Sequence, residues 1–164
     1  FYSVRTRGIP APAAYTPHAA GLEIARTYLT RSGEPLPANS VPQGALVVVK
    51  FAVRATSGPV ANVVLENLLP AGLEVENPRL ATTERLHGMG EDDKSRSNAL
   101  DLRDDRILMF TDLPDTGWQV HYALLRAVTP GVFRLPPAQA EAMYAPELRA
   151  SGEAATFTVT PAGQ

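Results

Sequence analysis

Apolar and polar residues alternate along much of this chain, most clearly in residues 45–56, ALVVVKFAVRAT. A period of two places successive side chains on opposite faces of a β-strand. Lys50 and Arg54 fall on one face, and the other face carries β-branched and aromatic residues that favour burial in a sheet. The residues expected to be buried are Val47, Val49, Phe51 and Val53. The pattern therefore predicts a long strand with one face in the core.

Shorter segments with strand-like patterns occur on both sides of this one. They are residues 2–8, 22–30, 61–72, 73–76, two runs within 99–114, 117–131, 131–136 and 154–161. In residues 117–131 one face carries large apolar side chains, which predicts that this face is buried and that His121 lies on the opposite one. The members of the apolar face are Trp118, Val120, Tyr122 and Leu124.

Prolines and glycines punctuate these segments, with 15 prolines and 12 glycines in 164 residues. About eight or nine short strands without the spacing of β-α-β units predict an all-β fold, an antiparallel immunoglobulin-like β-sandwich. The length suits a single domain over residues 1–164. Within it, residues 1–10 are expected to be a lead-in strand from a preceding domain, and the polar residues 81–98 to be a long loop.

Residues 134–150, RLPPAQAEAMYAPELRA, depart from the strand pattern. Alanine, glutamine and glutamate favour a helix, and the flanking prolines limit it to about two turns. We therefore expect one short helix near residues 137–144, ending in the large side chains of Met143 and Tyr144. Two interpretations stay open: the segment plugs the sandwich core, with Met143 packed beside Leu135 or Leu148, or it presents a surface to another partner.

Composition and charge narrow the possible functions. The net charge of −2 provides no long-range attraction to nucleic acid. No apolar run reaches the roughly 18 residues of a membrane span, so we expect no membrane insertion. The chain has no cysteine, which excludes disulfides and thiolate chemistry within it. Its first residues are patterned like a strand rather than a leader, so we expect a fragment of a longer protein.

The sequence contains few residues in arrangements that could bind a metal or catalyse a reaction. His18, His87 and His121 are scattered singly, and the acidic residues 91–94 lack the spacing of a calcium loop, so no metal site is expected. There is no G-x-S-x-G motif and no glycine-rich phosphate loop. Adjacent carboxylates in residues 104–105 point in different directions, which suits acid–base catalysis poorly. The sequence therefore predicts a non-catalytic domain without a cofactor.

The segment RDDR contains both charge signs at a predicted hairpin turn. One interpretation is a solvated turn, since exposed ion pairs contribute little on average. The other is an interdomain ion-pair patch. The residues concerned are Arg103, Asp104, Asp105 and Arg106.

Several blocks in order resemble the C-terminal domain of bacterial alpha-2-macroglobulins. They are NVVLENLLPAGLEVENPRL (62–80), LDLRDDRILMFTDLP (100–114), YALLRAVTPGVFRLPPAQAEAMYAPELRA (122–150) and FTVTPAG (157–163). The most specific pieces are LLPAGLEVENP, RDDR and the block A..MY.PE.RA. The resemblance covers roughly residues 45 to 163 and implies a macroglobulin-type β-sandwich.

The resemblance also implies a parent protein in the periplasm, exported or anchored by an N-terminal lipid, that traps proteases. Its partners would be those target proteases and bifunctional penicillin-binding proteins. In many members a neighbouring helical domain carries a Cys–Gln thioester, which the C-terminal domain covers and shields from water. That role would fall on Met143, with Tyr144 beside it, because an unbranched thioether fills irregular apolar gaps well.

Two further interpretations remain. If the parent lacks a thioester, the same segment would serve only as a docking surface, for example for a cell-envelope partner such as a penicillin-binding protein. A carbohydrate-binding module would require a flat row of exposed aromatic side chains, which the expected burial of Trp118 and Tyr122 opposes.

Overall fold

Thirteen strands and one short 3-10 helix make up the regular structure of this computed structural model, which describes residues 2–8, 15–76 and 99–163. The first strands are β1 (His18–Ala20), β2 (Leu22–Leu29), β3 (Ser40–Pro42), β4 (Leu46–Ala55), β5 (Val60–Leu68) and β6 (Leu73–Val75). They are followed by β7 (Ala99–Leu102), β8 (Arg106–Leu113), β9 (Gln119–Ala127), β10 (Gly131–Leu135), β11 (Gln139–Ala142), β12 (Ala145–Ser151) and β13 (Ala155–Thr160). The 3-10 helix is η1 (Pro37–Asn39). No helix among the described residues is long and apolar enough to cross a membrane.

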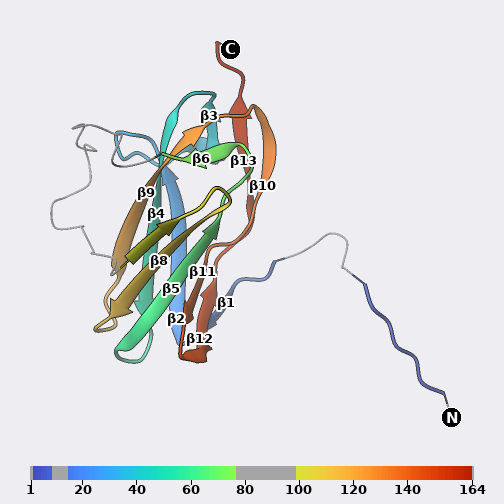
Figure 1. The fold of residues 1–164 in the computed structure, drawn as a ribbon, viewed down its shortest axis with the longest axis vertical. Helices are drawn as coiled ribbons and strands as arrows, with labels where there is room; N and C mark the ends of the chain where they lie inside the picture. Colours follow the sequence, from blue (N-terminus) through green and yellow to red (C-terminus); the bar gives the residue numbers. More distant parts are fainter. Residues whose placement is uncertain (1, 9–14, 77–98, 164) are drawn as a thin grey trace.

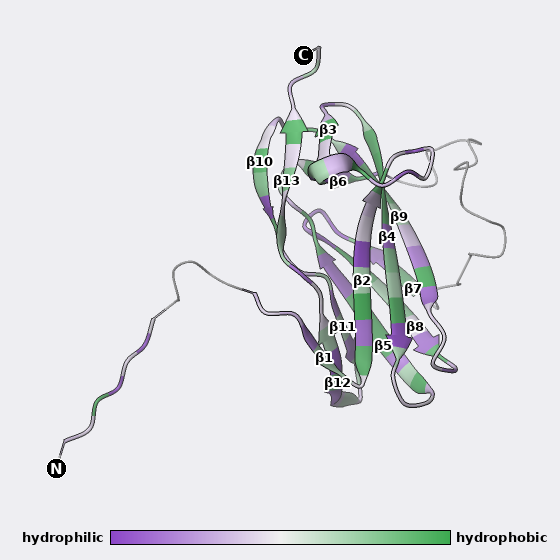
Figure 2. Cartoon of the chain, turned by 180° about the vertical axis from the view of Figure 1, so that it is seen from behind, coloured by the Kyte–Doolittle hydropathy of each residue, from purple (hydrophilic) through white to green (hydrophobic). Residues whose placement is uncertain are grey.

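The strands form three sheets. A six-stranded sheet has the order β1-β12-β11-β5-β8-β7, a four-stranded sheet β2-β4-β9-β6, and a three-stranded sheet β10-β13-β3. The six-stranded sheet faces the viewer in Figure 1 and the four-stranded sheet does so in Figure 2, so the two form the layers of a sandwich. All strand pairs are antiparallel except β3 with β13. The predicted all-β antiparallel sandwich is therefore confirmed.

The predicted orientation of residues 45–56 is confirmed in β4. Val47, Val49 and Val53 are fully buried, and Phe51 is 2% exposed. Their side chains belong to a core cluster that also contains residues of the six-stranded sheet, such as Val63. Hydrophobic burial of this kind is the main stabilising term in a domain of this size.

The predicted orientation of β9 is wrong. Trp118 is 47% exposed, whereas His121 is 3% exposed and Leu125 fully buried. Both faces of this segment carry apolar residues, so periodicity could not discriminate between them. Strand pairing decides the orientation: Tyr122 lies opposite Lys50 of β4, and paired residues share a face of the sheet.

Basic side chains lie over the aromatic rings on the outer face of the four-stranded sheet. The Arg54 guanidinium is 4.7 Å from the centre of the Trp118 ring, and the Lys50 ammonium is 6.0 Å from that of Tyr122. Glu23 holds Arg54 through a 2.7 Å ion pair. These cations lie where a sugar ring would have to stack, so the exposure of Trp118 does not create an open aromatic row.

The short helix expected near residues 137–144 is also wrong. Residues Gln139–Ala142 form β11, Met143 and Tyr144 form a turn, and β12 begins at Ala145. The helix propensity of alanine is overridden by packing, because small side chains fit between two neighbouring strands in the sheet interior. The alanines alternate with polar residues and are almost fully buried, at 1–2% exposure: Ala138, Ala140 and Ala142.

Residues 2–8 are exposed and are not part of any sheet. The strand expected there is not formed in this structure, and its assignment as a lead-in from a preceding domain stays a prediction. The loop expected at residues 81–98 lies outside the described residues. The turn expected at Asp104 and Asp105 is present, since it joins β7 to β8.

Candidate functional site

The turn between β11 and β12 carries two of the residues singled out from the sequence. Ala142 pairs with Ala145, so Met143 and Tyr144 alone form the connection. Met143 is 47% exposed and Tyr144 is 80% exposed. We call these two residues the hairpin tip. Because both side chains contact solvent, the interpretation that Met143 packs into the core is overturned, although Leu135, Ala138 and Ala140 of the same segment do belong to the core.

Hydrogen bonds hold the backbone of the hairpin tip, whereas its side chains are largely exposed to solvent. The Met143 amide donates a 2.9 Å hydrogen bond to the Asn62 carbonyl oxygen on β5. Asn62 has a φ of 55°, and its amide in turn donates to Asp112 Oδ1 at 2.7 Å. The register of β5 against β8 shifts at this point, between Val60 and Val63. An irregularity of this type re-aims local side chains and is common near functional sites.

The hairpin tip can form an apolar contact with a partner surface. A thioether and an aromatic ring together provide a large area that can be removed from water, and the tyrosine hydroxyl can also form a hydrogen bond. Because neighbouring strands already hold the backbone, little backbone entropy is lost when the tip docks. The geometry suits water exclusion and docking.

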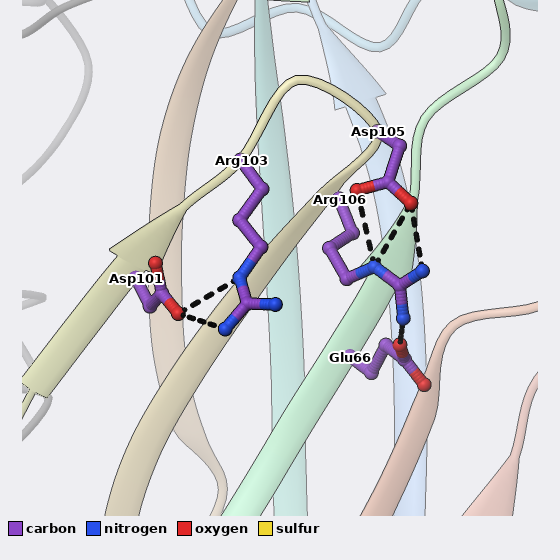
Figure 3. Close-up of polar contacts among 5 residues, drawn as sticks. All are labelled: Glu66, Asp101, Arg103, Asp105 and Arg106. Atoms are coloured by element: carbon purple, nitrogen blue, oxygen red, sulfur yellow. Dashed lines mark hydrogen bonds and ion pairs between the residues drawn. The ribbon is translucent and has the colours of Figure 1, made fainter.

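The RDDR segment forms two separate ion-pair groups. Arg103 contacts Asp101 at 2.9 Å, and Arg106 contacts Asp105 on one side and Glu66 of β5 on the other, both at 2.7 Å (Figure 3). Glu66 could not be identified from local sequence patterns, because it is distant in sequence from Arg106 and only the pairing of β5 with β8 brings it close. Asp101 is only two residues from Arg103, but alternation along the strand does not by itself predict this contact.

Both ion-pair groups join residues of this chain to one another. Hydrogen bonds from Arg106 lower the pKa of the Asp105 carboxyl, and Asp105 and Glu66 together raise the pKa of Arg106. The Leu69 amide also donates to the Asp105 carbonyl oxygen at 2.9 Å, which ties the turn to the end of β5. Asp104 is exposed at the turn. An interdomain role for Arg103, Asp104, Asp105 and Arg106 stays a prediction.

Arg106→Gln is expected to destabilise the domain at neutral pH by an amount that shrinks in acid. The lowered pKa of Asp105 means that its pairing stabilises the native state above its ordinary pKa of 3.8 and is lost as the pH falls below that value. Urea unfolding of the wild type and the variant at pH 7 and pH 2.5 checks this, with the exposed Arg134→Gln as control. An equal difference at both pH values would contradict the expected role.

The described residues contain no group of three or more metal-binding side chains. His121 is buried, and its Nε2 has no hydrogen-bond partner within the part of the chain that the structure describes. Burial lowers the pKa of His121, which favours the neutral imidazole. His121 is therefore a packing residue of the interior. His18 begins β1, and His87 lies outside the described residues.

The strand pattern of the sequence already placed one charged residue, Arg26, on an inward-facing position, and the structure shows that it is partly buried. Arg26 shares the inward-facing positions of β2 with the buried residues Leu22 and Tyr28. Its Nη1 donates a 2.6 Å hydrogen bond to Oδ1 of Asn67, which is 1% exposed on β5. A cationic side chain at an inward-facing strand position indicates that it has a buried hydrogen-bond partner or belongs to a binding site. The sequence does not show which residue is that partner, because the partner lies on another strand.

Comparison with known proteins adds family information to this geometry. A family profile for the Bacterial Alpha-2-macroglobulin MG10 domain matches residues 21–147. An alpha-2-macroglobulin of Xylella fastidiosa strain 9a5c is 33% identical over 168 residues, which cover 98% of this chain and 10% of that protein. The alpha-2-macroglobulin of Escherichia coli K12 is 34% identical over 142 residues, covering 81% of this chain and 8% of that protein.

Solved structures of alpha-2-macroglobulins also match this chain. Salmonella alpha-2-macroglobulin reacted with methylamine matches with a TM-score of 0.80 at 33% identity, over 92% of this chain and 10% of that chain. Trypsin-activated alpha-2-macroglobulin from Escherichia coli matches with a TM-score of 0.79 at 32% identity, over 88% of this chain and 11% of that one. The chain thus spans about a tenth of the length of these relatives.

Proposed function

Because the chain belongs to the MG10 domain family of bacterial alpha-2-macroglobulins, we propose that it is the non-catalytic C-terminal domain of a periplasmic protease-trapping protein. In this proposal the hairpin tip docks on the neighbouring helical domain and covers a thioester there. The observation that carries the proposal is the exposure of Met143 and Tyr144 on a backbone fixed by hydrogen bonds. The protease trap is the function of the full-length protein, with the target proteases as its partners.

The chemistry of a thioester explains why such a cover is needed. Water and amines attack its carbonyl carbon, so it persists only where both are excluded. Met143 can fill an irregular gap over the thioester, and Tyr144 adds an aromatic surface beside it. Complete burial of a side chain such as that of methionine contributes about 1.5–3 kcal/mol. Among the relatives, the Salmonella protein was solved after reaction with methylamine and the Escherichia coli protein after activation by trypsin, which supports the proposal by analogy.

Met143→Ala in a full-length parent that carries a thioester is expected to speed its reaction with methylamine. Because Met143 is already about half buried, docking can remove only the remaining half of its surface from water. Loss of about 0.7–1.5 kcal/mol corresponds to an increase of about 3- to 12-fold in rate if this contact protects the closed state. The measurement is incorporation of labelled methylamine by the intact, uncleaved protein. An unchanged rate would exclude the shielding role.

Two controls separate docking from damage to the fold. Val132 is 72% exposed on β10, so Val132→Ala truncates an apolar side chain that is more exposed than Met143 and should leave the methylamine rate unchanged. In the isolated chain, Met143→Ala should change the free energy of unfolding by no more than about 0.5 kcal/mol, because the side chain is half-exposed. If the parent lacks a thioester, the same substitution should instead weaken the contact between the two domains.

A further inference from the structure

The outer edge of β2 has no paired strand over its central residues within the described part of the chain, although Gly152 lies near the Ile24 carbonyl oxygen. β2 is the terminal strand of the four-stranded sheet. Isolated bridges bracket the edge at both ends, from Gly21 to Arg149 and from Leu29 to Pro35. No strand pairs with this edge between the two bridges within the described part of the chain. An unpaired strand edge is a template for another extended chain.

The hydrogen bonds at its two ends show which backbone groups face this edge. The Gly21 carbonyl oxygen accepts a bond from Thr56 on the β4 side, and the Tyr28 carbonyl oxygen accepts one from Leu36 on the outer side. Backbone groups alternate in direction along a strand, so the even-numbered residues face outward. The amide and carbonyl groups of Ile24 and Arg26 are therefore directed toward this edge.

A cavity of about 660 Å³ lies along this edge, lined by β2 and by residues near the end of β12. Its apolar wall includes Ile24, Leu36, Leu135 and Ala138. The volume falls within the range of ligand sites in proteins, and the strand edge makes the cavity a groove. An extended segment in it could pair with β2 on one side and place alternate side chains against the apolar wall.

Arg26 gives this groove a chemical preference. It lines the cavity, and among the described residues no carboxylate forms an ion pair with it. Its guanidinium has the neutral Asn67 amide oxygen as acceptor at 2.6 Å and lies 5.5 Å from the centre of the Tyr28 ring. Burial lowers the pKa of Arg26, although the nearby Tyr28 opposes the shift. A partly buried cation without a counter-charge is stabilised by any carboxylate that reaches it.

Tyr28 lies beside Arg26 and lines the inner part of the groove. Its side chain is 3% exposed, and its hydroxyl has no hydrogen-bond partner within the described residues. Burial raises the pKa of this hydroxyl, while the proximity of Arg26 and Asn67 lowers it by less. No bond of acceptable geometry to Asn67 is present. The hydroxyl is buried, so the acid preference of the groove depends on Arg26 and not on Tyr28.

We propose that the edge of β2 binds an extended segment of a partner protein as an additional strand, with one Asp or Glu of that segment facing Arg26. The backbone groups of Ile24 and Arg26 would pair with the segment, and its apolar side chains would lie on the groove wall. Glu153 also lines the cavity and disfavours a second acidic residue near it. The preferred segment is therefore about five to seven residues long, alternating, and carries one carboxylate. This site is independent of the thioester proposal.

A displayed library of random heptapeptides, selected on the intact chain, tests this inference. The wild type should enrich alternating sequences with one acidic residue at a fixed position. Replacing that residue by Gln in a synthetic copy should weaken binding by at least about tenfold. Amide hydrogen exchange should show new protection at Ile24 and Arg26. Failure to enrich any peptide, enrichment without the acidic residue, or protection elsewhere would overturn the proposal.

Variants of Arg26 identify the source of the acid preference. Arg26→Met should bind the Glu and Gln peptides equally, while Arg134→Met, at an exposed position on β10, should keep the preference. If Arg26→Met does not fold, as judged by circular dichroism, Arg26→Lys replaces it. That variant keeps the charge but loses the fork geometry, so the preference should be reduced but not abolished. An unchanged preference in both Arg26 variants would overturn the assignment.

Discussion

Phe157→Ala is expected to lower the free energy of unfolding by about 3–5 kcal/mol, which is the typical effect of removing a large buried aromatic side chain. Phe157 is fully buried on β13. Its ring meets that of Tyr28 on β2 edge-on, with 5.0 Å between the centres and 62° between the planes. Phe157 also lies opposite Phe133 of β10. The substitution therefore leaves a cavity where the three-stranded sheet packs against the four-stranded sheet.

Urea unfolding monitored by circular dichroism measures this effect. Val132→Ala is the control on the neighbouring strand, since Val132 is 72% exposed and should lose at most about 0.5 kcal/mol. Phe157→Leu keeps most of the volume and should lose less than the alanine variant. A loss below about 1 kcal/mol for Phe157→Ala would show that Phe157 does not join the two sheets as the structure indicates.

Gly21→Ala is expected to destabilise the domain by about 2–4 kcal/mol, for two reasons that add together. Gly21 connects β1 of the six-stranded sheet to β2 of the four-stranded sheet, and its φ is +72°. That left-handed conformation costs a residue with a side chain about 1–2 kcal/mol. An added Cβ would also clash with Leu148 Cδ2, so Leu148 would have to move from its position against the core.

Gly44→Ala is the matched control for the steric component. Gly44 has a φ of +87°, and no atom lies within 4 Å of the position of an added Cβ. It should therefore show the conformational cost of about 1–2 kcal/mol alone. The difference between the two variants in urea unfolding gives the contribution of the contact with Leu148. Equal losses would mean that Leu148 moves away without cost.

The errors of the sequence analysis have a common origin in tertiary packing. The segment around Ala140 was predicted to be a helix because of residue propensity, although its alanines also alternate with polar residues as in a strand. Burial between β5 and β12 selects the strand. The orientation of β9 was ambiguous because both of its faces are apolar. The pairing of Tyr122 with Lys50 on β4 settles it.

The hairpin tip and the ion pairs of the RDDR segment were only partly predictable, because several of their contacts join residues that are far apart in the sequence. The sequence singled out Met143 and Tyr144 as large side chains on a short connection, and the structure shows both at the turn of a hairpin. The support of that turn by Asn62, on another strand, is a contact between residues far apart in sequence. The partner of Arg106 on β5, Glu66, is likewise supplied by strand pairing.

By itself, the sequence determined the fold class and the family resemblance, because alternation, turn residues and local motifs are properties of neighbouring positions. It also determined the orientation of β4, whose two faces differ sharply in polarity. Only the tertiary structure decided which face of β9 is buried, that residues 139–142 join a sheet, and that, among the described residues, the edge of β2 has no paired strand beside an arginine without an ion pair. These features depend on strand pairing and packing between residues distant in the chain, which local patterns do not specify.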